Sequence, residues 1–149
     1  MSKIRVTKKF HFEMAHTLHN YDGLCKHIHG HSYHLEVTLI GETKNEPGAV
    51  KDGMVIDFGD LKKIVKPKVV DKFDHSYMVN ANAPKERLEK LDKLTQRLIV
   101  VDFQPTAENI VVYIADLIKP ELPSHVELYS IRLSETATAF AEWFASDNQ

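Results

Sequence analysis

Hydrophobic and polar residues alternate with a period of two over two long stretches near the N-terminus. Residues 4–16 carry mostly apolar side chains at their even positions, and His16 ends this apolar face. Residues 29–43 repeat the pattern with apolar odd positions. Side chains of a strand point alternately to its two faces, so each stretch is predicted to be a half-buried strand. Two more strands are predicted in the C-terminal part, over about residues 126–135 and 138–144.

Between these strand pairs, apolar residues recur at helical spacing in two segments. Asp57 is a good helix N-cap, and the helix that follows it is predicted to end near residues 73–75. Pro67 lies inside this helix and is expected to kink or divide it, because proline has no N–H to donate. Thr106 is predicted to cap a second helix that runs through Ile118.

A third, more exposed helix is predicted between Lys85 and Leu98, where leucines recur among alternating charges. This segment is the expected insertion in the fold. The order of elements predicts one α+β domain over residues 1–149, in which helices cover one face of an antiparallel sheet of four strands. Such a sheet has exposed edges, and we therefore expect the chain to form an oligomer.

The composition excludes several classes of protein. The 149 residues are 43% hydrophobic and 27% charged, which is typical of a globular chain and not of a disordered one. The formal net charge of -2 gives no bulk attraction for nucleic acid or an anionic membrane. No apolar run is long enough for a membrane span and no signal-peptide pattern opens the sequence, so a cytoplasmic protein is expected. A single cysteine, Cys25, excludes an internal disulfide framework.

Histidine is the residue type that stands out, because seven of the nine histidines lie between residues 11 and 34. His29 and His31 are two residues apart in an extended segment, so both rings project from one face and can bind one metal ion. Three nitrogen ligands with an open fourth position are typical of catalytic zinc. His16 is the preferred third ligand, since it ends the apolar face of the neighbouring strand. His27 is a rival ligand, and histidines that bind no metal are the plainer alternative.

Cys25 lies in a polar loop four residues before His29 and permits three interpretations. A free cysteine is most often a small buried hydrophobic residue. It could also be a fourth zinc ligand that closes a structural site, or a thiolate held beside an open catalytic site. The spacing by itself does not decide among them.

Four further candidates lie outside the histidine cluster. Asp74 and His75 are adjacent at a predicted helix end, where an acid can orient an imidazole for proton transfer, although most such pairs are solvated. Glu135 shares a strand face with Leu133 and is expected to be either a buried ligand anchor or an edge carboxylate. Thr106 is most simply the cap of a helix N-terminus.

Taken in order, these residues lie in short motifs that resemble those of a known family. The motifs are FEMAH at 12–16, CKHIHGH at 25–31, IDF at 56–58, FDH at 73–75, PTAEN at 105–109 and SET at 134–136. They are similar to motifs of the 6-pyruvoyltetrahydropterin and 6-carboxytetrahydropterin synthase family, and the resemblance covers essentially the whole chain. The sequence departs from the family at Met14, where a small residue is common, and over residues 79–104, which are longer than in compact members.

The resemblance implies the tunnelling fold, in which ββααββ units assemble into a barrel, commonly as a homohexamer made of two trimers. It also implies a zinc ion and a pterin triphosphate as the small-molecule substrate. The implied roles are zinc ligation by His16, His29 and His31, proton abstraction by Cys25, a relay by Asp74 and His75, and pterin anchoring by Glu135, with Thr106 near the pterin. A carboxylate suits the anchor, since it can accept two parallel N–H donors from the guanidine-like edge of a pterin.

The activity that the resemblance implies is a zinc-dependent conversion of 7,8-dihydroneopterin triphosphate to 6-carboxy-5,6,7,8-tetrahydropterin. Triphosphate and acetaldehyde would be released, on the route to queuosine and other 7-deazaguanines. Three residues separate Cys25 from the HGH motif, and this spacer resembles that of the carboxytetrahydropterin branch. Two alternatives stay open: synthesis of 6-pyruvoyltetrahydropterin for biopterin, and a non-catalytic zinc-binding module in which Cys25 completes a closed site.

Overall fold

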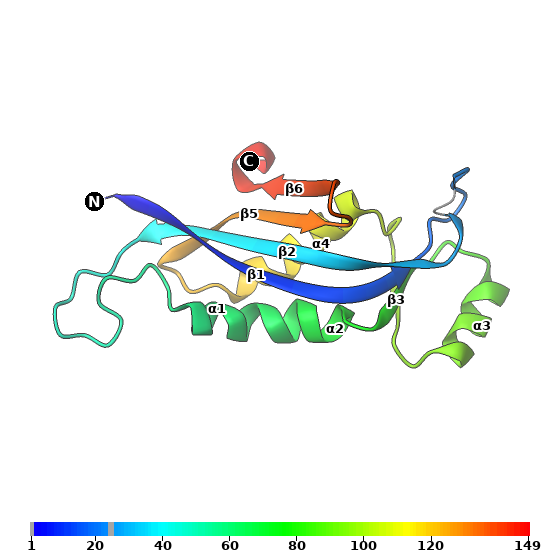
Figure 1. The fold of residues 1–149 in the computed structure, drawn as a ribbon, viewed down its shortest axis with the longest axis horizontal. Coiled ribbons are helices and arrows are strands. Elements are labelled where there is room, and N and C mark those ends of the chain that lie inside the picture. The colour runs from blue at the N-terminus through cyan, green and yellow to red at the C-terminus, as the bar shows by residue number, and fades with distance from the viewer. Residues whose placement is uncertain (1, 24–25) are drawn as a thin grey trace.

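A curled sheet of six strands runs along the molecule, and helices cover one of its faces (Figure 1). The computed structural model describes residues 2–23 and 26–149, so Cys25 lies outside the described residues. The spatial order of the strands is β4-β3-β1-β2-β5-β6. The strands are β1 (Lys3–His16), β2 (His29–Glu42), β3 (Ser76–Asn80), β4 (Leu98–Val101), β5 (Val126–Ser134) and β6 (Phe140–Phe144). The helical segments are α1 (Phe58–Val65), η2 (Lys66–Val70), α2 (Asp71–Phe73), α3 (Lys85–Leu94), α4 (Ala107–Ile118), η3 (Lys119–Glu121) and η4 (Ala145–Asn148).

β1 and β2 form one long antiparallel ladder, which confirms the two strands predicted near the N-terminus. All 14 residues of each strand are paired, and the ladder ends with His16 opposite His29. His31 is opposite Met14, two positions further along the same face. The ladder therefore gathers three histidines on one face of the sheet, at the end where β1 leads into the 17–28 loop.

The two strands predicted in the C-terminal part are also confirmed. β5 pairs antiparallel with β2 on one side and with β6 on the other. The chain turns directly after β5, where the N–H groups of Glu135 and Thr136 both donate to the carbonyl oxygen of Ala139, at 3.1 and 3.4 Å. Glu135 is thus the first residue beyond the strand.

The predicted sheet of four antiparallel strands is wrong in the number and direction of its strands. The four expected strands are antiparallel neighbours, but β3 and β4 extend the sheet beyond β1 and run parallel to it. All five residues of β3 are buried, so its sequence has no polar alternation, and β4 has only four residues. Parallel strands are joined by a crossover and not by a tight turn. The sequence therefore has no hairpin turn residues that would have indicated β3 and β4. The sheet is mixed.

The helix predicted after Asp57 is confirmed as a continuous run of α1, η2 and α2. Asp57 caps its N-terminus through a side-chain hydrogen bond. Pro67 widens the run into one π-helical turn, in which the N–H of Asp71 bonds to the carbonyl oxygen of Lys66. A proline inside a helix removes one donor and crowds the preceding turn, and the wider turn accommodates it.

The other two predicted helices are present, and one of them is shorter than expected. α4 begins after Thr106, whose Oγ1 accepts the N–H of Asn109 at 3.2 Å. α3 ends at Leu94, because the next residue, Thr95, is extended with φ −141°. Leu98, expected in this helix, opens β4 instead. Among the described residues, no helix has the length and apolar character needed to cross a bilayer.

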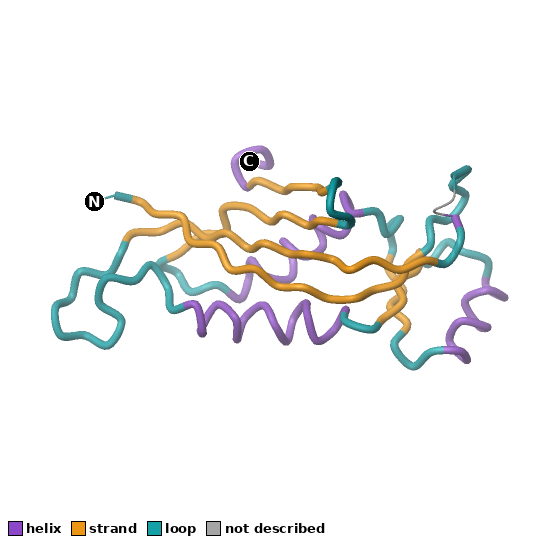
Figure 2. The backbone as a smooth tube through the Cα atoms, in the orientation of Figure 1, coloured by secondary structure: helices purple, strands orange, loops and turns teal. Residues whose placement is uncertain are grey.

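The hydrophobic core has a large part and a small part. The large part lies between the sheet and the helices α1, η2, α2 and α4, and its largest fully buried side chains include Phe12, Tyr33, Phe73, Ile110 and Ile114. The small part comprises Tyr77, Val79, Ala83 and Leu91, from β3, α3 and the turn between them. The segment β3-α3-β4 is therefore a small unit with its own core at one end of the sheet. Figure 2 shows this unit and the described residues of the 17–28 loop at one end, with the 43–57 loop at the other.

Candidate metal centre and catalytic groups

Three histidines and one glutamate converge at the end of the β1–β2 ladder. Nε2 of His16 lies 2.9 Å from Nε2 of His29, and both face Glu135 and His31. The four ligand atoms, one from each residue, all lie within 4.8 Å of one another. His16 and His29 are cross-strand neighbours, whereas Glu135 comes from the turn after β5. This group could bind one metal ion.

Hydrogen bonds orient two of the imidazole rings toward the same point. Nδ1 of His16 is 2.7 Å from the carbonyl oxygen of Pro105, and Nδ1 of His29 is 2.8 Å from that of His27. A carbonyl only accepts, so each Nδ1 carries the proton and donates it. Each Nε2 then has a free lone pair, which is the arrangement of metal-binding histidines. Two lone pairs facing each other at 2.9 Å repel, and a cation between them removes the repulsion.

His31 and Glu135 complete the group. Oε1 of Glu135 lies 2.8 Å from Nε2 of His31 and 3.6 Å from Nε2 of His16. Nε2 of His31 is buried, and among the described residues its contact is this carboxylate oxygen, with no further hydrogen bond. A metal ion at this point would give the nitrogen lone pair a partner. The residues present therefore fit a metal ion.

The surroundings of two histidines favour the neutral ring that a metal requires. Burial lowers the pKa of His16 below its ordinary value, although the hydrogen bond to Pro105 and the charge of Glu135 act in the opposite direction. Burial likewise lowers the pKa of His31, again opposed by Glu135. Since only a neutral imidazole nitrogen can ligate a metal, both shifts favour ligation at neutral pH.

His27 and Cys25 are the two other residues that the sequence suggested as metal ligands. His27 is exposed and contributes its backbone carbonyl to His29, while its ring lies outside the converging group. Cys25 lies outside the described residues, so its three interpretations stay open. The preferred ligands His16, His29 and His31 are thus the ones that the structure brings together.

Asp74 and His75 form a pair immediately before β3. Nδ1 of His75 lies 2.8 Å from Oδ2 of Asp74. The other carboxylate oxygen, Oδ1, accepts the N–H of Glu13 at 2.8 Å. This N–H holds the pKa of the Asp74 carboxyl below its ordinary value, and His75 adds to the shift. Asp74 is therefore a fixed anion that orients the exposed ring of His75.

A shallow pocket of about 380 Å³ lies between this pair and the β1–β2 ladder. Its lining includes His75, Glu13, Gly30, His31 and Ser32. Oγ of Ser32 donates to the Glu13 carboxylate at 2.6 Å, which closes one side of the pocket with polar groups. The pocket thus touches both the Asp–His pair and one residue of the candidate metal group.

Thr106 lies next to the candidate metal group through its neighbour in sequence. The carbonyl oxygen of Pro105 accepts from His16, and Thr106 caps α4. The N-terminus of α4 is therefore held directly beside the buried histidine. This placement is compatible with a role for Thr106 near a bound ligand, while its cap explains its presence without one.

Gln104 is a residue that the sequence reasoning missed. Its side-chain Nε2 donates to the carbonyl oxygen of His19 at 2.6 Å, and its Oε1 accepts the N–H of His19 at 2.9 Å. Its own carbonyl oxygen accepts from Asn109 at 3.0 Å. Gln104 thus ties the start of the 17–28 loop to the start of α4. No spacing or motif signals this contact, because the two residues are 85 positions apart.

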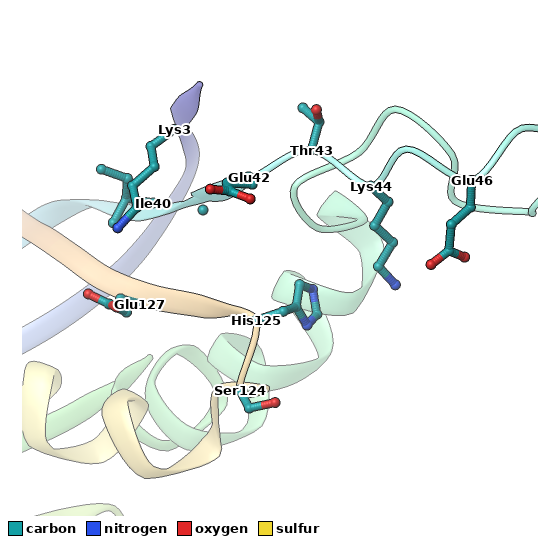
Figure 3. Close-up of a pocket in the computed structure, with 10 residues that line it drawn as sticks. Lys3, Ile40, Glu42, Thr43, Lys44, Glu46, Ser124, His125 and Glu127 are labelled. Carbon is teal, nitrogen blue, oxygen red and sulfur yellow. The ribbon is translucent and has the colours of Figure 1, made fainter. Parts of the chain in front are cut away.

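A larger pocket, of about 460 Å³, lies at the opposite end of the β1–β2 ladder (Figure 3). It is lined by Lys3 and Glu42, which pair at the far end of the ladder from His16. Fourteen residues of strand span roughly 45 Å, so this pocket is remote from the histidines. Among the described residues, His125 and the glutamates of this pocket do not belong to a group that could bind a metal ion. The small pocket beside His31 is therefore the better candidate for a substrate.

The fold and the site define a class of protein: an α+β chain with a three-histidine, one-glutamate candidate metal centre beside an aspartate–histidine pair. Residues 5–145 match the family described as 6-pyruvoyl tetrahydropterin synthase. The chain belongs to this family.

Relatives and solved structures agree with this assignment. The chain is 38% identical over 141 residues to the 6-carboxy-5,6,7,8-tetrahydropterin synthase of Haemophilus influenzae, covering 93% of this chain and 97% of that one. It is 32% identical to the Rickettsia bellii enzyme of the same name, covering 93% and 99%. The structure of 6-pyruvoyl tetrahydropterin synthase from Caenorhabditis elegans is similar, with a TM-score of 0.69, 26% identity and 97% of both chains covered. An uncharacterized protein from Wolinella succinogenes shares the fold, with a TM-score of 0.79, 21% identity and coverage of 97% and 99%.

Proposed function

We propose that the protein converts 7,8-dihydroneopterin triphosphate to 6-carboxy-5,6,7,8-tetrahydropterin, as a zinc-dependent carbon–carbon lyase. The observation that carries the proposal is the convergence of His16, His29, His31 and Glu135 in a chain of the pterin synthase family. Relatives with 38% and 32% identity are named for this carboxytetrahydropterin product. The product would feed the synthesis of 7-deazaguanines such as queuosine.

Zinc is the metal that we propose for the histidine group. His16, His29 and His31 would hold it through Nε2, because Nδ1 of the first two is already bonded to a carbonyl. Neutral imidazoles suit zinc, and three nitrogen ligands leave room for a substrate. When bound, zinc supplies a Lewis acid that makes the substrate's side-chain hydroxyls more acidic and stabilises negative charge that develops on them.

Cys25 and the Asp74–His75 pair are the proposed groups for proton transfer. The cysteine thiolate would take a proton from a side-chain carbon of the substrate, after which triphosphate leaves by elimination. His75, oriented by Asp74 at 2.8 Å, would relay the proton. The exposed ring of His75, which lines a pocket beside the β1–β2 ladder, supports this role because it is accessible to a substrate.

Glu135 is the proposed anchor of the pterin ring. Its side chain is 21% exposed and lies beside the histidines, at the edge of the group where a substrate could reach it. Three histidines suffice for a catalytic zinc site, which leaves the carboxylate available for two N–H donors of the pterin. Thr106, at the start of α4, is the second proposed pterin contact.

One assay tests the proposed activity. The purified chain, loaded with zinc, is incubated with 7,8-dihydroneopterin triphosphate, and the products are identified by mass. We expect 6-carboxy-5,6,7,8-tetrahydropterin, with triphosphate and acetaldehyde in equal amounts. Formation of 6-pyruvoyltetrahydropterin without acetaldehyde would assign the chain to the biopterin branch. No turnover at all would favour the zinc-binding module.

Replacement of Cys25 distinguishes the enzyme from the zinc-binding module. We expect Cys25→Ala to abolish turnover while zinc content stays that of the unchanged protein, because a base is lost and no ligand is. Metal content by mass spectrometry and X-ray absorption at the zinc edge measure the two possibilities. A sulfur ligand in the unchanged protein, and loss of zinc from the variant, would support the closed structural site instead.

A further inference from the structure

The side chain of Arg97, directly before β4, contacts the backbone of the turn that carries Asp74 and His75. Nη2 of Arg97 donates to the carbonyl oxygen of Asp71 at 2.7 Å and to that of Lys72 at 3.2 Å. Nε donates to the carbonyl oxygen of Asp74 at 3.1 Å. One guanidinium therefore binds three backbone carbonyls that directly precede His75.

These carbonyls belong to the end of a helix, where the last oxygens have no partner within the helix. Arg97 satisfies those of Asp71, Lys72 and Asp74, and Oγ of Ser76 donates to that of Phe73 at 2.5 Å. Every carbonyl from residue 71 to residue 74 thus has a donor from outside the helix. A positive charge at a helix C-terminus is also favourable for the helix dipole.

The turn needs this support because His75 has an unusual backbone. Its φ is +61°, in the left-handed region that residues other than glycine rarely adopt. On one side, the N–H of His75 donates to the carbonyl oxygen of Glu13 at 2.6 Å, and Glu13 in turn donates to Asp74. On the other side, Arg97 holds the preceding carbonyls. Such a conformation persists only where its surroundings enforce it, and it is frequent at functional sites.

Arg97 is itself fixed by the sheet. Its carbonyl oxygen accepts the N–H of Tyr77, and Leu98, the next residue, is opposite Tyr77 in the parallel pair of β3 and β4. The side chain therefore starts from a strand edge that is part of the sheet and reaches back across the end of α2. Lysine cannot replace this contact in full, because only the planar guanidinium presents several donors in fixed directions.

We propose that Arg97 is a positioning residue for catalysis, because it holds the Asp74–His75 turn in its reactive geometry. The function of the β3-α3-β4 unit would then be to carry this arginine. The inference rests on the proposed role of His75 in proton transfer. A displacement of about 1 Å in a catalytic group can lower the rate about 100-fold, so a side chain that touches no substrate can control turnover.

The test compares three variants of the full, zinc-loaded chain: Arg97→Ala, Arg97→Lys and Arg87→Ala. Arg87 is exposed on α3 and has no hydrogen bond or ion pair among the described residues, so it is the matched control. We expect Arg97→Ala to lower kcat about 10- to 100-fold while KM and zinc content change less than about twofold. Arg97→Lys should recover part of kcat, and Arg87→Ala should equal the unchanged protein. A wild-type kcat in Arg97→Ala would overturn the inference.

The pH dependence of kcat gives a second readout that a loss of stability would not move. The pKa of Asp74 is held low by the N–H of Glu13 and by the nearby His75 and His11, and the backbone that carries Asp74 is held by Arg97. When the turn loosens, the carboxyl should titrate closer to its ordinary value. The acid limb of the profile should therefore move to higher pH in Arg97→Ala and stay in place in Arg87→Ala. An unmoved limb in both would contradict the inference.

Hydrogen exchange tests whether Arg97 holds the turn, and it does so without depending on the proposed enzymatic activity. The unchanged chain and the three variants are exchanged into D₂O, and the peptide that contains residues 71–76 is followed by mass spectrometry. We expect exchange of this peptide to be at least about tenfold faster in Arg97→Ala, intermediate in Arg97→Lys and unchanged in Arg87→Ala. If the unchanged chain fails to turn over the pterin, the proposed function is wrong, and this measurement still decides whether Arg97 holds the turn. Equal exchange in all four proteins would overturn the inference.

Discussion

At the residue scale, the candidate metal centre depends on which nitrogen of each histidine is free. His16 and His29 each donate from Nδ1 to a backbone carbonyl, which leaves Nε2 for a metal. The carbonyl oxygen that binds His16 comes from Pro105, 89 positions away in the sequence. The tautomer of this candidate ligand is thus set by a backbone carbonyl and not by a side chain.

Alanine substitution at the ligands should remove the metal selectively. We expect His16→Ala, His29→Ala and His31→Ala each to lower bound zinc at least about tenfold, because each removes one of three nitrogen ligands. His27→Ala is the control, since this ring is exposed and lies outside the group. Metal content of the four purified variants measures the outcome. Full zinc occupancy in His16→Ala would refute the choice of third ligand.

Glu135 allows a sharper test, because it lies within reach of both the metal group and a substrate. If it anchors the pterin, Glu135→Gln should keep zinc at the level of the unchanged protein and raise KM about 10-fold or more, since an amide cannot accept two N–H donors with charge. Titration calorimetry with a pterin and metal analysis measure the two effects separately. Loss of zinc from Glu135→Gln would make the carboxylate a fourth ligand.

At the element scale, tertiary contacts decide how the segments around the site are held. The 17–28 loop is joined to the rest of the molecule at its start by Gln104, and the Asp74–His75 turn is joined to β4 by Arg97. Both contacts come from the segment that the sequence marked as an insertion, residues 79–104. Residues 79–104 are therefore part of the support of the site.

Gln104→Ala should loosen the 17–28 loop. The substitution removes two hydrogen bonds to the backbone of His19, each worth about 0.5–1.5 kcal/mol. We expect a melting temperature lower by a few degrees, at about 2–4 °C for each kcal/mol, and faster amide exchange confined to residues 17–23. Gln96→Ala, at an exposed position with no hydrogen bond among the described residues, is the matched control. Unchanged exchange in the Gln104 variant would show that other contacts hold the loop.

The element scale also shows which local patterns were reliable. Alternation predicted β1 and β2 because one face of each is polar, and the caps Asp57 and Thr106 predicted the helix starts. β3 was missed because all of its residues are buried, so it has no alternation to detect. The end of α3 was placed too late for a related reason: the leucine spacing continues into β4, although the backbone becomes extended at Thr95.

At the scale of the whole molecule, the sheet leaves two edges open. β4 and β6 are the outermost strands, and β1 pairs with β3 only over Met14–His16, so most of its length has a free edge as well. Free edges are sites for strand pairing between copies. We therefore expect copies of the chain to associate through these edges, and the barrel that the family resemblance implies leads us to expect a homohexamer.

Light scattering should therefore give a multiple of three subunits, with six expected. The reason is that the free edge of β1 and the edge of β6 are both available for antiparallel pairing with neighbouring copies. Sedimentation at several protein concentrations is an independent measurement. A stable monomer at micromolar concentration would contradict the prediction, and so would a dimer that does not associate further.

The sequence by itself determined the local elements with a regular period and the helix caps, and it predicted that His16, His29 and His31 come together. These follow from spacing along one chain: His29 and His31 are two positions apart in a strand and so share one face, and the alternating apolar face of residues 4–16 ends at His16. Only the tertiary structure decided the mixed six-stranded sheet, the position of Glu135 beside His31, and the contacts of Pro105, Gln104 and Arg97. Those contacts join residues that are far apart in the sequence. The hydrophobic pattern of a short segment does not indicate which distant backbone group will lie opposite a given side chain.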